Sequence, residues 1–295
     1  TCDCAMQAYA KVKQIGKGAF GCAWLVRSKN GGTLVAKEVS MGGMSKADRA
    51  VAQQEASVLR SLNHPNIIGM YEDFVEADNL IIIMEYADGG DLDKMLKAAK
   101  NTPLSEESAL DLFCQILQGM EHVHSLKFLH RDIKPANILL TSSSPPRAKL
   151  ADFGVARVLS ANTTQAQTVI GTPYYLSPEM VESKGYNQKS DVWALGCVLY
   201  EMLALKHAFG GDNIAQVVLK IMKASPCPLP SSYSSKIREL TTSMLALEPS
   251  LRPSVSEALA HPAFRLLSPS ANASAKQTTA RGSSVERAMP GGRAE

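Results

Sequence analysis

The sequence predicts an α+β fold of two lobes, in which a small antiparallel β-sheet with one helix lies over a larger, mostly helical lobe. Short apolar stretches separated by glycine-containing turns run from Tyr9 to Val39, as is typical of strands joined by hairpins. After the turn Asp88-Gly89-Gly90-Asp91, apolar residues recur at helical spacing instead. We therefore expect a small lobe at 9–87 and a large lobe at 88–264.

The composition is that of a globular chain. With 295 residues, 45% of them hydrophobic, it can form one large domain or two small lobes that share a core. The densest apolar stretch, from Val192 to Leu205, is interrupted by Glu201 and is too short to span a membrane, so it predicts a buried helix. The net charge of +3 equals the excess of five basic over two acidic residues from Arg265 onward. The balanced remainder gives no reason to expect binding to nucleic acid or to a membrane.

The two ends of the chain differ from its middle. Residues 1–8 carry no pattern and are expected to form an N-terminal flank. Residues 265–295 are rich in serine, alanine, threonine and glycine, so we expect a disordered tail or a linker there. The six cysteines are scattered and no secretory leader is recognisable, which predicts reduced thiols in the cytosol or nucleus.

A glycine pattern lies near the start of the small lobe. Gly16, Gly18 and Gly21 stand between two expected strands, where their backbone N–H groups can approach a polyphosphate. A dinucleotide-binding fold would need this pattern at a strand-to-helix turn, so its position argues against that fold. Lys37 follows on the next strand, where its ammonium group can reach the same phosphates.

A helix and two further strands complete the expected small lobe. Ser45 begins a capping-box-like sequence, and apolar residues then recur at helical spacing as far as Leu62. Glu55 lies off the most apolar line of this helix, as expected for a side chain that pairs with a charge outside it. Strands are expected at Ile67 to Glu72 and at Leu80 to Glu85, the second of them buried on both faces.

The polar stretch from His130 to Asn137 lies between apolar residues, so we expect an exposed loop held by buried segments. In it, Asp132 can take a proton from an attacking hydroxyl, Lys134 can hold a transferring phosphate, and the amide oxygen of Asn137 can hold a metal ion. Asp152 can supply a second metal ligand. A single His-Arg-Asp sequence is more often a loop ion pair, but the complete ordered set favours a phosphoryl-transfer site.

These motifs, in this order and spacing, resemble those of Ser/Thr protein kinases. The sequences from Gly171 to Glu179, from Lys189 to Glu201 and from Ala87 to Leu92 resemble, within that group, the NIMA-related (Nek) kinases. The resemblance covers residues 9–264 and implies the bilobal protein-kinase fold, non-specific protein serine/threonine kinase activity, and ATP and Mg²⁺ as cofactors. It also implies protein substrates and a cytoplasmic location, at the cytoskeleton, the centrosome or the base of a cilium, with a role in the cell cycle or in cilia.

The resemblance extends to individual positions. Asp132, Lys134, Lys37 and Asn137 are the implied catalytic residues, and Asn137 and Asp152 are the implied magnesium ligands. The implied nucleotide-binding residues are Ile15, Gly16, Lys17, Gly18, Ala19, Phe20, Gly21, Ala23, Val35, Lys37, Met84, Glu85, Ala87, Asp91 and Leu139.

Two positions of the nucleotide pocket depart from the usual kinase pattern. Val35 stands where alanine is usual, and Ala23 stands where valine is usual. The exchange moves methyl groups from one side of the pocket to the other, so the volume of the pocket is roughly unchanged. At the far end of the pocket, Asp91 is expected to reach the ribose hydroxyls.

Four residues are expected to support the site without reacting. Glu55 would pair with Lys37 and hold its ammonium group on the phosphates. Glu179 would form a buried ion pair with Arg252. Asp191 would brace the backbone of the loop from His130 to Asn137, which is called the catalytic loop below.

The segment between the Asp-Phe-Gly and Ser-Pro-Glu sequences is expected to act as a switch, because it is rich in threonine and glutamine and has few apolar anchors. A phosphate on Thr168, added by an upstream kinase or by the protein itself, can bind Arg131. The alternative is an ordinary loop hydroxyl. Thr172 lies where Ser/Thr kinases bridge the catalytic aspartate and lysine, and Val155 implies threonine rather than serine acceptors.

Two other functions stay open at this point. A pseudokinase or scaffold would bind protein partners through the same fold, but such proteins commonly lack at least one of the catalytic residues present here. A small-molecule phosphotransferase is disfavoured by the long segment before Glu179, which is suited to a peptide platform. The oligomeric state cannot be predicted from these residues.

Overall fold

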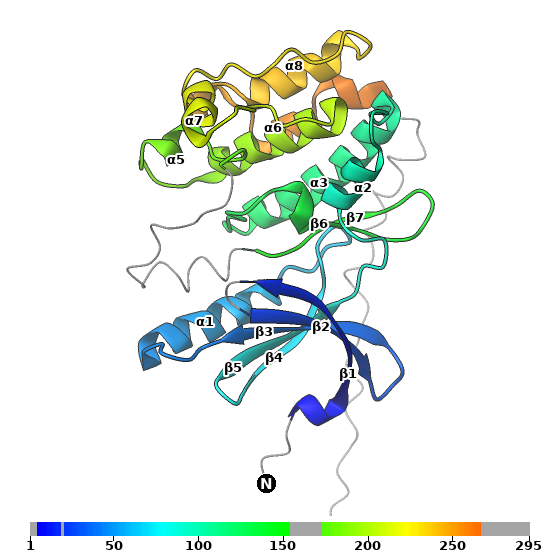
Figure 1. Cartoon of the computed structure of the whole chain (residues 1–295), viewed down its shortest axis with the longest axis vertical. Coiled ribbons are helices and arrows are strands. Elements are labelled where there is room, and N and C mark those ends of the chain that lie inside the picture. The colour runs from blue at the N-terminus through cyan, green and yellow to red at the C-terminus, as the bar shows by residue number, and fades with distance from the viewer. Residues whose placement is uncertain (1–4, 19–20, 154–172, 267–295) are drawn as a thin grey trace, which may run out of the picture.

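The computed structural model describes residues 5–18, 21–153 and 173–266. It has a lobe containing a β-sheet at one end and a mostly helical lobe at the other, which confirms the predicted α+β fold of two lobes (Figure 1). The first described residues form a short 3-10 turn, Ala5–Ala8, next to the sheet.

The small lobe is built on one antiparallel sheet of five strands, in the order β1-β2-β3-β5-β4. One helix, α1, connects β3 to β4 and packs against β4. The elements are β1 (Tyr9–Gly18), β2 (Gly21–Ser28), β3 (Thr33–Ser40), α1 (Lys46–Leu59), β4 (Met70–Glu76) and β5 (Asn79–Glu85).

Both faces of this sheet are covered, as the aliphatic sequence of β5 predicts. Ile82 packs with Val39 and with Ala56 of α1 on one face. Ile81 and Ile83 point to the other face, where they pack with Val26. β5 is therefore buried on both sides, which fixes its position next to β3 in the sheet.

The large lobe consists mainly of helices around α6, whose residues from Ser190 to Leu203 are all buried. A two-stranded sheet of β6 and β7 lies at its junction with the small lobe. The elements are α2 (Leu92–Ala98), α3 (Glu106–Ser125), the 3-10 turn Pro135–Asn137, β6 (Ile138–Leu140), β7 (Ala148–Leu150), α5 (Pro178–Val181), α6 (Gln188–Ala204), α7 (Ile214–Met222), α8 (Ser235–Met244), the 3-10 turn Pro249–Leu251, α9 (Val255–Leu259) and the 3-10 turn Pro262–Leu266.

The strand expected at Ile67 to Glu72 begins later than predicted, as β4 at Met70. The residues before it bind the large lobe: Ile68 N–H donates to Leu150 O at 2.9 Å, and Leu150 N–H donates to Asn66 O at 2.8 Å. Gly119 of α3 makes this close approach possible, because a Cβ there would lie 2.7 Å from Asn66 O. The start of this strand was predicted wrongly, because an apolar sequence does not show which strand its residues will pair with.

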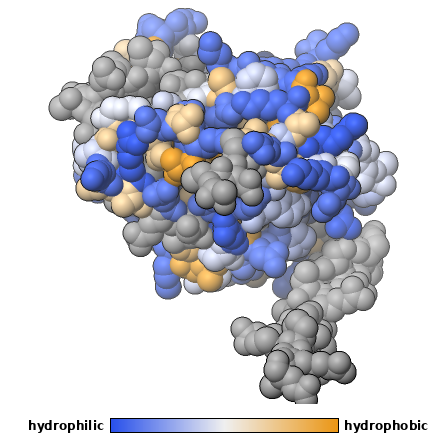
Figure 2. All heavy atoms as spheres, turned by 90° about the horizontal axis from the view of Figure 1, so that it is seen from below, coloured by the Kyte–Doolittle hydropathy of each residue, from blue (hydrophilic) through white to orange (hydrophobic). Residues whose placement is uncertain are grey.

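The described surface is mostly polar. The view of the small-lobe end in Figure 2 is largely hydrophilic, with small separate hydrophobic areas. Within the described ranges, every helix is too short or too polar to cross a lipid bilayer.

Candidate active site

The loop from His130 to Asn137 connects α3 to β6 and brings the predicted phosphoryl-transfer residues together. Lys134 Nζ lies 2.7 Å from Asp132 Oδ2. The side-chain amide of Asn137 donates to the same oxygen at 2.8 Å and to Asp132 O at 2.7 Å. The Asp132 carboxylate is thus held by two donors, while 40% of its side chain stays exposed to solvent.

Asp191 at the start of α6 braces this loop, as predicted. Its carboxylate is fully buried and accepts the backbone N–H groups of His130 and Arg131, each at 3.1 Å. Arg131 has a φ of 67°, a conformation that most residues avoid, and the hydrogen bond to Asp191 helps to hold it. Because a buried carboxylate is costly without partners, the loop and Asp191 stabilise each other.

Two further residues, which are not among the predicted site residues, hold Asp191. His124 Nε2 lies 2.9 Å from Asp191 Oδ2, and the Tyr186 hydroxyl donates to Asp191 Oδ1. His124 lies in the last turn of α3, and Tyr186 precedes α6. Their only signal in the sequence is their position just before the catalytic loop and just before Asp191, which is too general to identify a contact.

Lys37 of β3 forms an ion pair with Asp152, across the two lobes. The side chains of Lys37 and Asp152 are 27% and 50% exposed, so the pair lies at a solvent-accessible opening. Asp152 has a φ of 56°, and its neighbour Phe153 packs its ring 4.6 Å from that of the buried His130. The residues on which the phosphoryl-transfer hypothesis depends therefore converge, although they lie far apart in the sequence.

The ligands expected for Mg²⁺ are compatible with this geometry. The Asn137 amide nitrogen is committed to Asp132, which leaves the amide oxygen as the atom able to bind a cation. Mg²⁺ prefers oxygen ligands and is commonly held by one or two protein groups together with substrate phosphates. Among the described residues, no cluster of three or more His, Cys, Asp or Glu side chains could hold a metal ion by itself. The Asn137 and Asp152 oxygens thus fit an ion that arrives with a nucleotide.

Four strand residues of the small lobe that are predicted to bind nucleotide lie on one face of the sheet. Ala23 lies opposite Lys37 in the pairing of β2 with β3, and Val35 lies opposite Met84 in the pairing of β3 with β5. Gly21 can only be glycine, because a Cβ there would lie 1.7 Å from the Glu38 carbonyl oxygen. The β2 backbone at Gly21 therefore lies close against β3, with no room for a side chain.

The other wall of this face comes from β6 and from the hinge, the segment from Glu85 to Ala87 at the end of the small lobe. Met84 and Leu139 pack against the small buried cluster that contains Ala87. Asp91 forms an isolated bridge with Leu139, and its carboxylate caps α2 by accepting Lys94 N–H at 2.8 Å. Lys94 Nζ lies 2.7 Å from the second Asp91 oxygen, so ribose hydroxyls would have to share these acceptors.

Glu85 has additional contacts that the sequence did not predict. Its backbone N–H donates to Gly69 O at 2.8 Å. Its side chain accepts Gly69 N–H at 3.1 Å and lies 3.0 Å from Lys149 Nζ. Because Lys149 belongs to β7, these contacts attach the hinge to the strand that leads into Asp152.

The predicted ion pair of Glu179 with Arg252 is present and buried. Arg252 Nη1 and Nη2 lie 2.8 Å and 2.9 Å from the two Glu179 oxygens, and the arginine side chain is 0% exposed. Burial alone would raise the pKa of Glu179, but the hydrogen bonds from Arg252 and Ser190 outweigh this effect and lower it to about 2. The pair fixes the end of the 173–179 stretch to the large lobe.

Several predicted positions lie outside the described residues: Ala19, Phe20, Val155, Thr168 and Thr172. The backbone of Glu55 belongs to α1, but its side chain is likewise outside what is described, so its pairing with Lys37 stays a prediction. Of the other residues in the glycine pattern, Ile15, Gly16, Lys17 and Gly18 form the end of β1.

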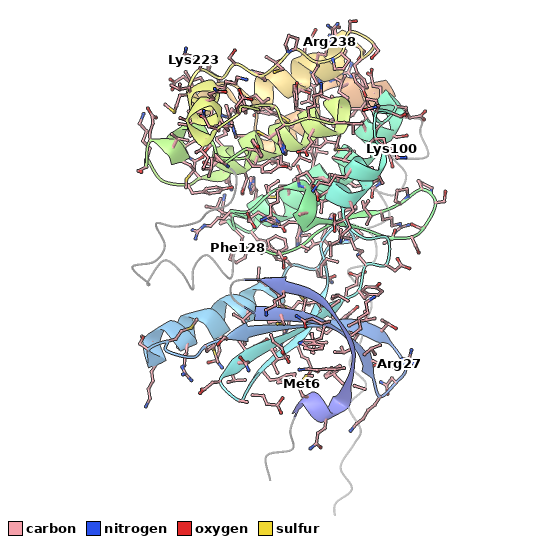
Figure 3. The ribbon with its side chains drawn as sticks, in the orientation of Figure 1. Met6, Arg27, Lys100, Phe128, Lys223 and Arg238 are labelled. Carbon is pink, nitrogen blue, oxygen red and sulfur yellow. The ribbon has the colours of Figure 1, made fainter. Side chains whose placement is uncertain are left out.

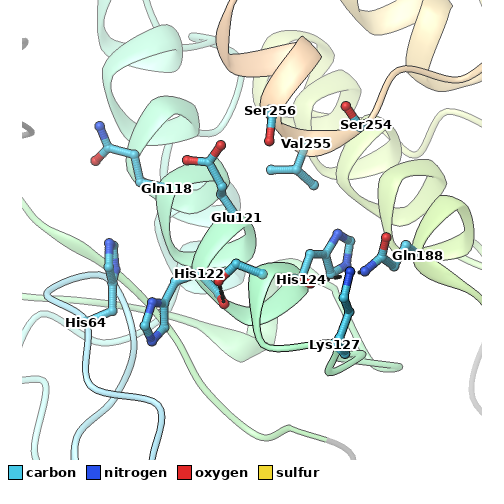
Figure 4. A pocket seen from close by; sticks show the side chains of 11 residues that line it. His64, Gln118, Glu121, His122, His124, Lys127, Gln188, Ser254, Val255 and Ser256 are labelled. Carbon is cyan, nitrogen blue, oxygen red and sulfur yellow. Dashed lines mark hydrogen bonds between the residues drawn. The ribbon is translucent and has the colours of Figure 1, made fainter.

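Figure 4 shows a hollow of about 540 Å³ on the large lobe that is separate from these residues. It lies between α3, the start of α6 and α9, and its wall includes His124, Lys127 and Gln188. Gln188 Nε2 donates to His124 O at 3.2 Å. None of the predicted catalytic or nucleotide-binding residues lines it, so the hollow is not the active site.

Comparisons with known proteins agree with this geometry. The family model described as "Protein kinase domain" matches residues 9–264. The chain is 46% identical over 255 residues to "Serine/threonine-protein kinase Nek1" of Mus musculus, a match that covers 86% of this chain and 21% of that protein. It is 46% identical over 257 residues to "Serine/threonine-protein kinase Nek8" of Danio rerio, covering 87% and 37%.

A shorter relative is matched over most of its length. The chain is 40% identical over 267 residues to "Serine/threonine-protein kinase nekl-2" of Caenorhabditis elegans, covering 87% of this chain and 74% of that protein. By contrast, it spans only about a fifth of Nek1 and less than two fifths of Nek8. The chain belongs to the protein kinase family and, within it, to the Nek serine/threonine-protein kinases.

Proposed function

We propose that this chain is an active, ATP- and Mg²⁺-dependent kinase that transfers the γ-phosphate of ATP to serine and threonine hydroxyls of proteins. The observation that carries the proposal is the ion pair of Lys37 with Asp152, which joins a small-lobe strand to the large lobe at a solvent-accessible position. A phosphoryl-transfer site needs these groups within reach of one terminal phosphate.

Each residue of the site has its own role in the proposed phosphate transfer. Asp132 accepts the proton of the substrate hydroxyl, and its contacts with Lys134 and Asn137 fix the direction of its carboxylate. Lys134 and Lys37 neutralise the charge of the transferring phosphate from opposite sides. Asn137 and Asp152 supply the oxygens for Mg²⁺, which, when bound, neutralises charge on the β- and γ-phosphates.

The Asp132→Asn variant tests the proposal. Because the amide cannot accept the proton, transfer of radiolabelled phosphate to casein should fall by about 10²–10⁴-fold, while ATP binding, measured by calorimetry, should persist. The matched control is Asp78→Asn in the turn between β4 and β5, which removes an exposed carboxylate and should leave transfer unchanged.

Two results would contradict this function. Full turnover by Asp132→Asn would refute the assignment of the base. ATP binding by the unaltered chain, with no transfer to any protein substrate, would favour the pseudokinase or scaffold alternative instead.

We also propose that a phosphate on Thr168 activates the chain by binding Arg131, and that Thr172 supports the catalytic residues. The basis is the position of Arg131 in the catalytic loop, next to Asp132. Treatment with a phosphatase should then lower the activity, and Thr168→Ala should make it insensitive to that treatment. Undiminished activity after complete dephosphorylation would contradict the switch.

Substrate choice and location are proposals based on the family. Val155 supports a preference for threonine acceptors, which a peptide array with matched serine and threonine peptides tests; a clear preference for serine would contradict it. A cytoplasmic location, at the cytoskeleton, centrosome or base of a cilium, can be tested by microscopy of the tagged chain. Uniform nuclear fluorescence would contradict it.

A further inference from the structure

The last described stretch of the chain begins with a turn that carries two consecutive tyrosines. Leu176 N–H donates to Pro173 O at 3.1 Å and closes this turn. Tyr174 and Tyr175 occupy its two middle positions, and both are half-buried. The turn lies directly before the helix that contains Glu179, so one end of it is fixed by the buried ion pair of that residue.

The two tyrosines pack on an apolar cluster of the large lobe. In this cluster the rings of Trp193 from α6 and of Phe209 stack with their centroids 5.1 Å apart. Ile221 of α7 belongs to the same cluster, and α7 ends at Lys223, which lies at the outer edge of the lobe (Figure 3). Because these residues are buried and closely packed, they form a rigid base for the turn.

His207 is in ring contact with both tyrosines. Its ring is stacked on that of Tyr174, with the centroids 3.7 Å apart and the planes at 19°. The ring of Tyr175 lies edge-on to it, at 6.0 Å and 86°. His207 follows the α6 C-cap Leu205 by two residues and directly precedes the buried Ala208, so its backbone is held by the large lobe. One side chain thus connects both rings of the turn to the end of α6.

The carboxylate of Glu201 lies beside these rings. It is 8% exposed and accepts the hydroxyl of Tyr175 at 2.6 Å. Burial and the charge of Glu201 raise the pKa of Tyr175 above its usual value, so the hydroxyl stays protonated and acts as the donor. His207 Nδ1 is 3.3 Å from Glu201 Oε2, yet among the described residues this buried nitrogen makes no hydrogen bond. The specific contribution of His207 is therefore the stack on Tyr174.

We propose that His207 is a positioning residue for protein substrates, and that it acts through Tyr174. The inference rests on the proposed function, in which the segment before Glu179 is a platform for the substrate chain. The turn is the described end of that platform, so the stack keeps the platform in the position that binds substrate. A site that is competent for only part of the time has a lower apparent affinity. ATP is bound by other residues and does not depend on this turn.

Steady-state kinetics, with casein and ATP varied in turn, separates this role from a general loss of structure. His207→Asn and Tyr174→Ala each remove the stack and should raise the KM for casein by about 3- to 10-fold, with the KM for ATP unchanged within about twofold. Tyr174→Phe keeps the ring and should behave as the unaltered chain. Lys206→Met, at the exposed neighbour of His207, is the matched control. Circular dichroism and thermal melting confirm that the variants fold.

The double variant of His207→Asn and Tyr174→Ala tests whether the two residues act through each other. Because the stack can be lost only once, the double variant should have the KM for casein of the more impaired single variant. A double variant in which the two effects multiply would overturn the proposal. So would an unchanged KM for casein in His207→Asn, or an equal rise in the KM for ATP.

Hydrogen exchange of the Leu176 amide tests the anchoring without any turnover. In His207→Asn the turn should open more often, and this amide should exchange about 3- to 10-fold faster than in the unaltered chain. An unaltered chain that transfers no phosphate would refute the proposed function, and the exchange rate would still decide whether His207 holds the turn. Equal exchange rates in the two chains would overturn the inference.

Discussion

The two sides of the active site are held in different ways. On the large-lobe side, the backbone of the catalytic loop is bound to Asp191, which is 0% exposed. On the small-lobe side, Lys37 reaches Asp152 through an ion pair that is open to water. Buried, hydrogen-bonded charges lose much when one partner is removed, whereas exposed pairs are worth little. The difference indicates a rigid half that orients the reacting groups and a second half whose contact can be exchanged when nucleotide and metal enter.

Loss of the Arg252 side chain should have the largest effect on folding. Arg252→Met leaves the Glu179 carboxylate buried without its partner and should lower the free energy of unfolding by about 3–5 kcal/mol. Urea unfolding followed by tryptophan fluorescence measures this change. Arg60→Met, which breaks an ion pair whose arginine is 46% exposed, is the control and should cost less than about 1 kcal/mol. Equal losses in the two variants would remove the distinction between buried and exposed pairs.

The pH dependence of unfolding should show the same ion pair. The pKa of Glu179 is lowered to about 2 in the folded chain, so the unfolded chain binds more protons between pH 4.5 and 2. The stabilisation is therefore fully present above pH 4.5 and is lost as the pH falls toward 2, by an amount on the order of 2–4 kcal/mol. Glu179→Gln should flatten this part of the stability curve. An unchanged slope in that variant would show that other carboxylates cause the acid sensitivity.

Asp191→Asn should have an intermediate effect. The amide keeps the shape of the side chain but is a weaker acceptor for the His130 and Arg131 N–H groups, so unfolding should become easier by about 1–3 kcal/mol. Since the catalytic loop then loses its anchor, kcat should fall by about 10- to 100-fold, with little change in the KM for ATP. Steady-state kinetics separates the two constants. Asp93→Asn on α2 is the control, and a rise in KM alone would contradict a bracing role for Asp191.

Much of this large-lobe support could be predicted from the sequence. The dense apolar stretch from Val192 to Leu205 predicted α6, and the family motifs identified Asp132, Asp191 and the pair of Glu179 with Arg252. The contacts of Tyr186 and His124 with Asp191 could not be predicted, because they depend on how the end of α3 approaches the start of α6. Periodicity shows which face of a helix is apolar, but not which side chain of another helix meets it.

The junction of the lobes was harder to predict than either lobe. The apolar sequence at Ile67 and Ile68 is equally suited to a strand of the sheet and to the observed contact with β7. Similarly, Glu85 was expected only as a nucleotide-binding residue, whereas its carboxylate binds Lys149. Both contacts cross from one lobe to the other, and no local sequence pattern specifies them.

The smallest effect on folding is expected on the small-lobe side of the active site. Lys37→Met breaks an ion pair whose partners are 27% and 50% exposed, so the free energy of unfolding should change by less than about 1 kcal/mol. The same change removes a cation from the phosphates, so kcat/KM for ATP should fall by about 10²-fold or more. Lys11→Met is the matched control, because it breaks the pair with Glu38 on the same sheet without removing a group from the active site. A large loss of stability in Lys37→Met would mean that the contact between the lobes is as firmly held as the catalytic loop, and the contrast between the two sides would fail.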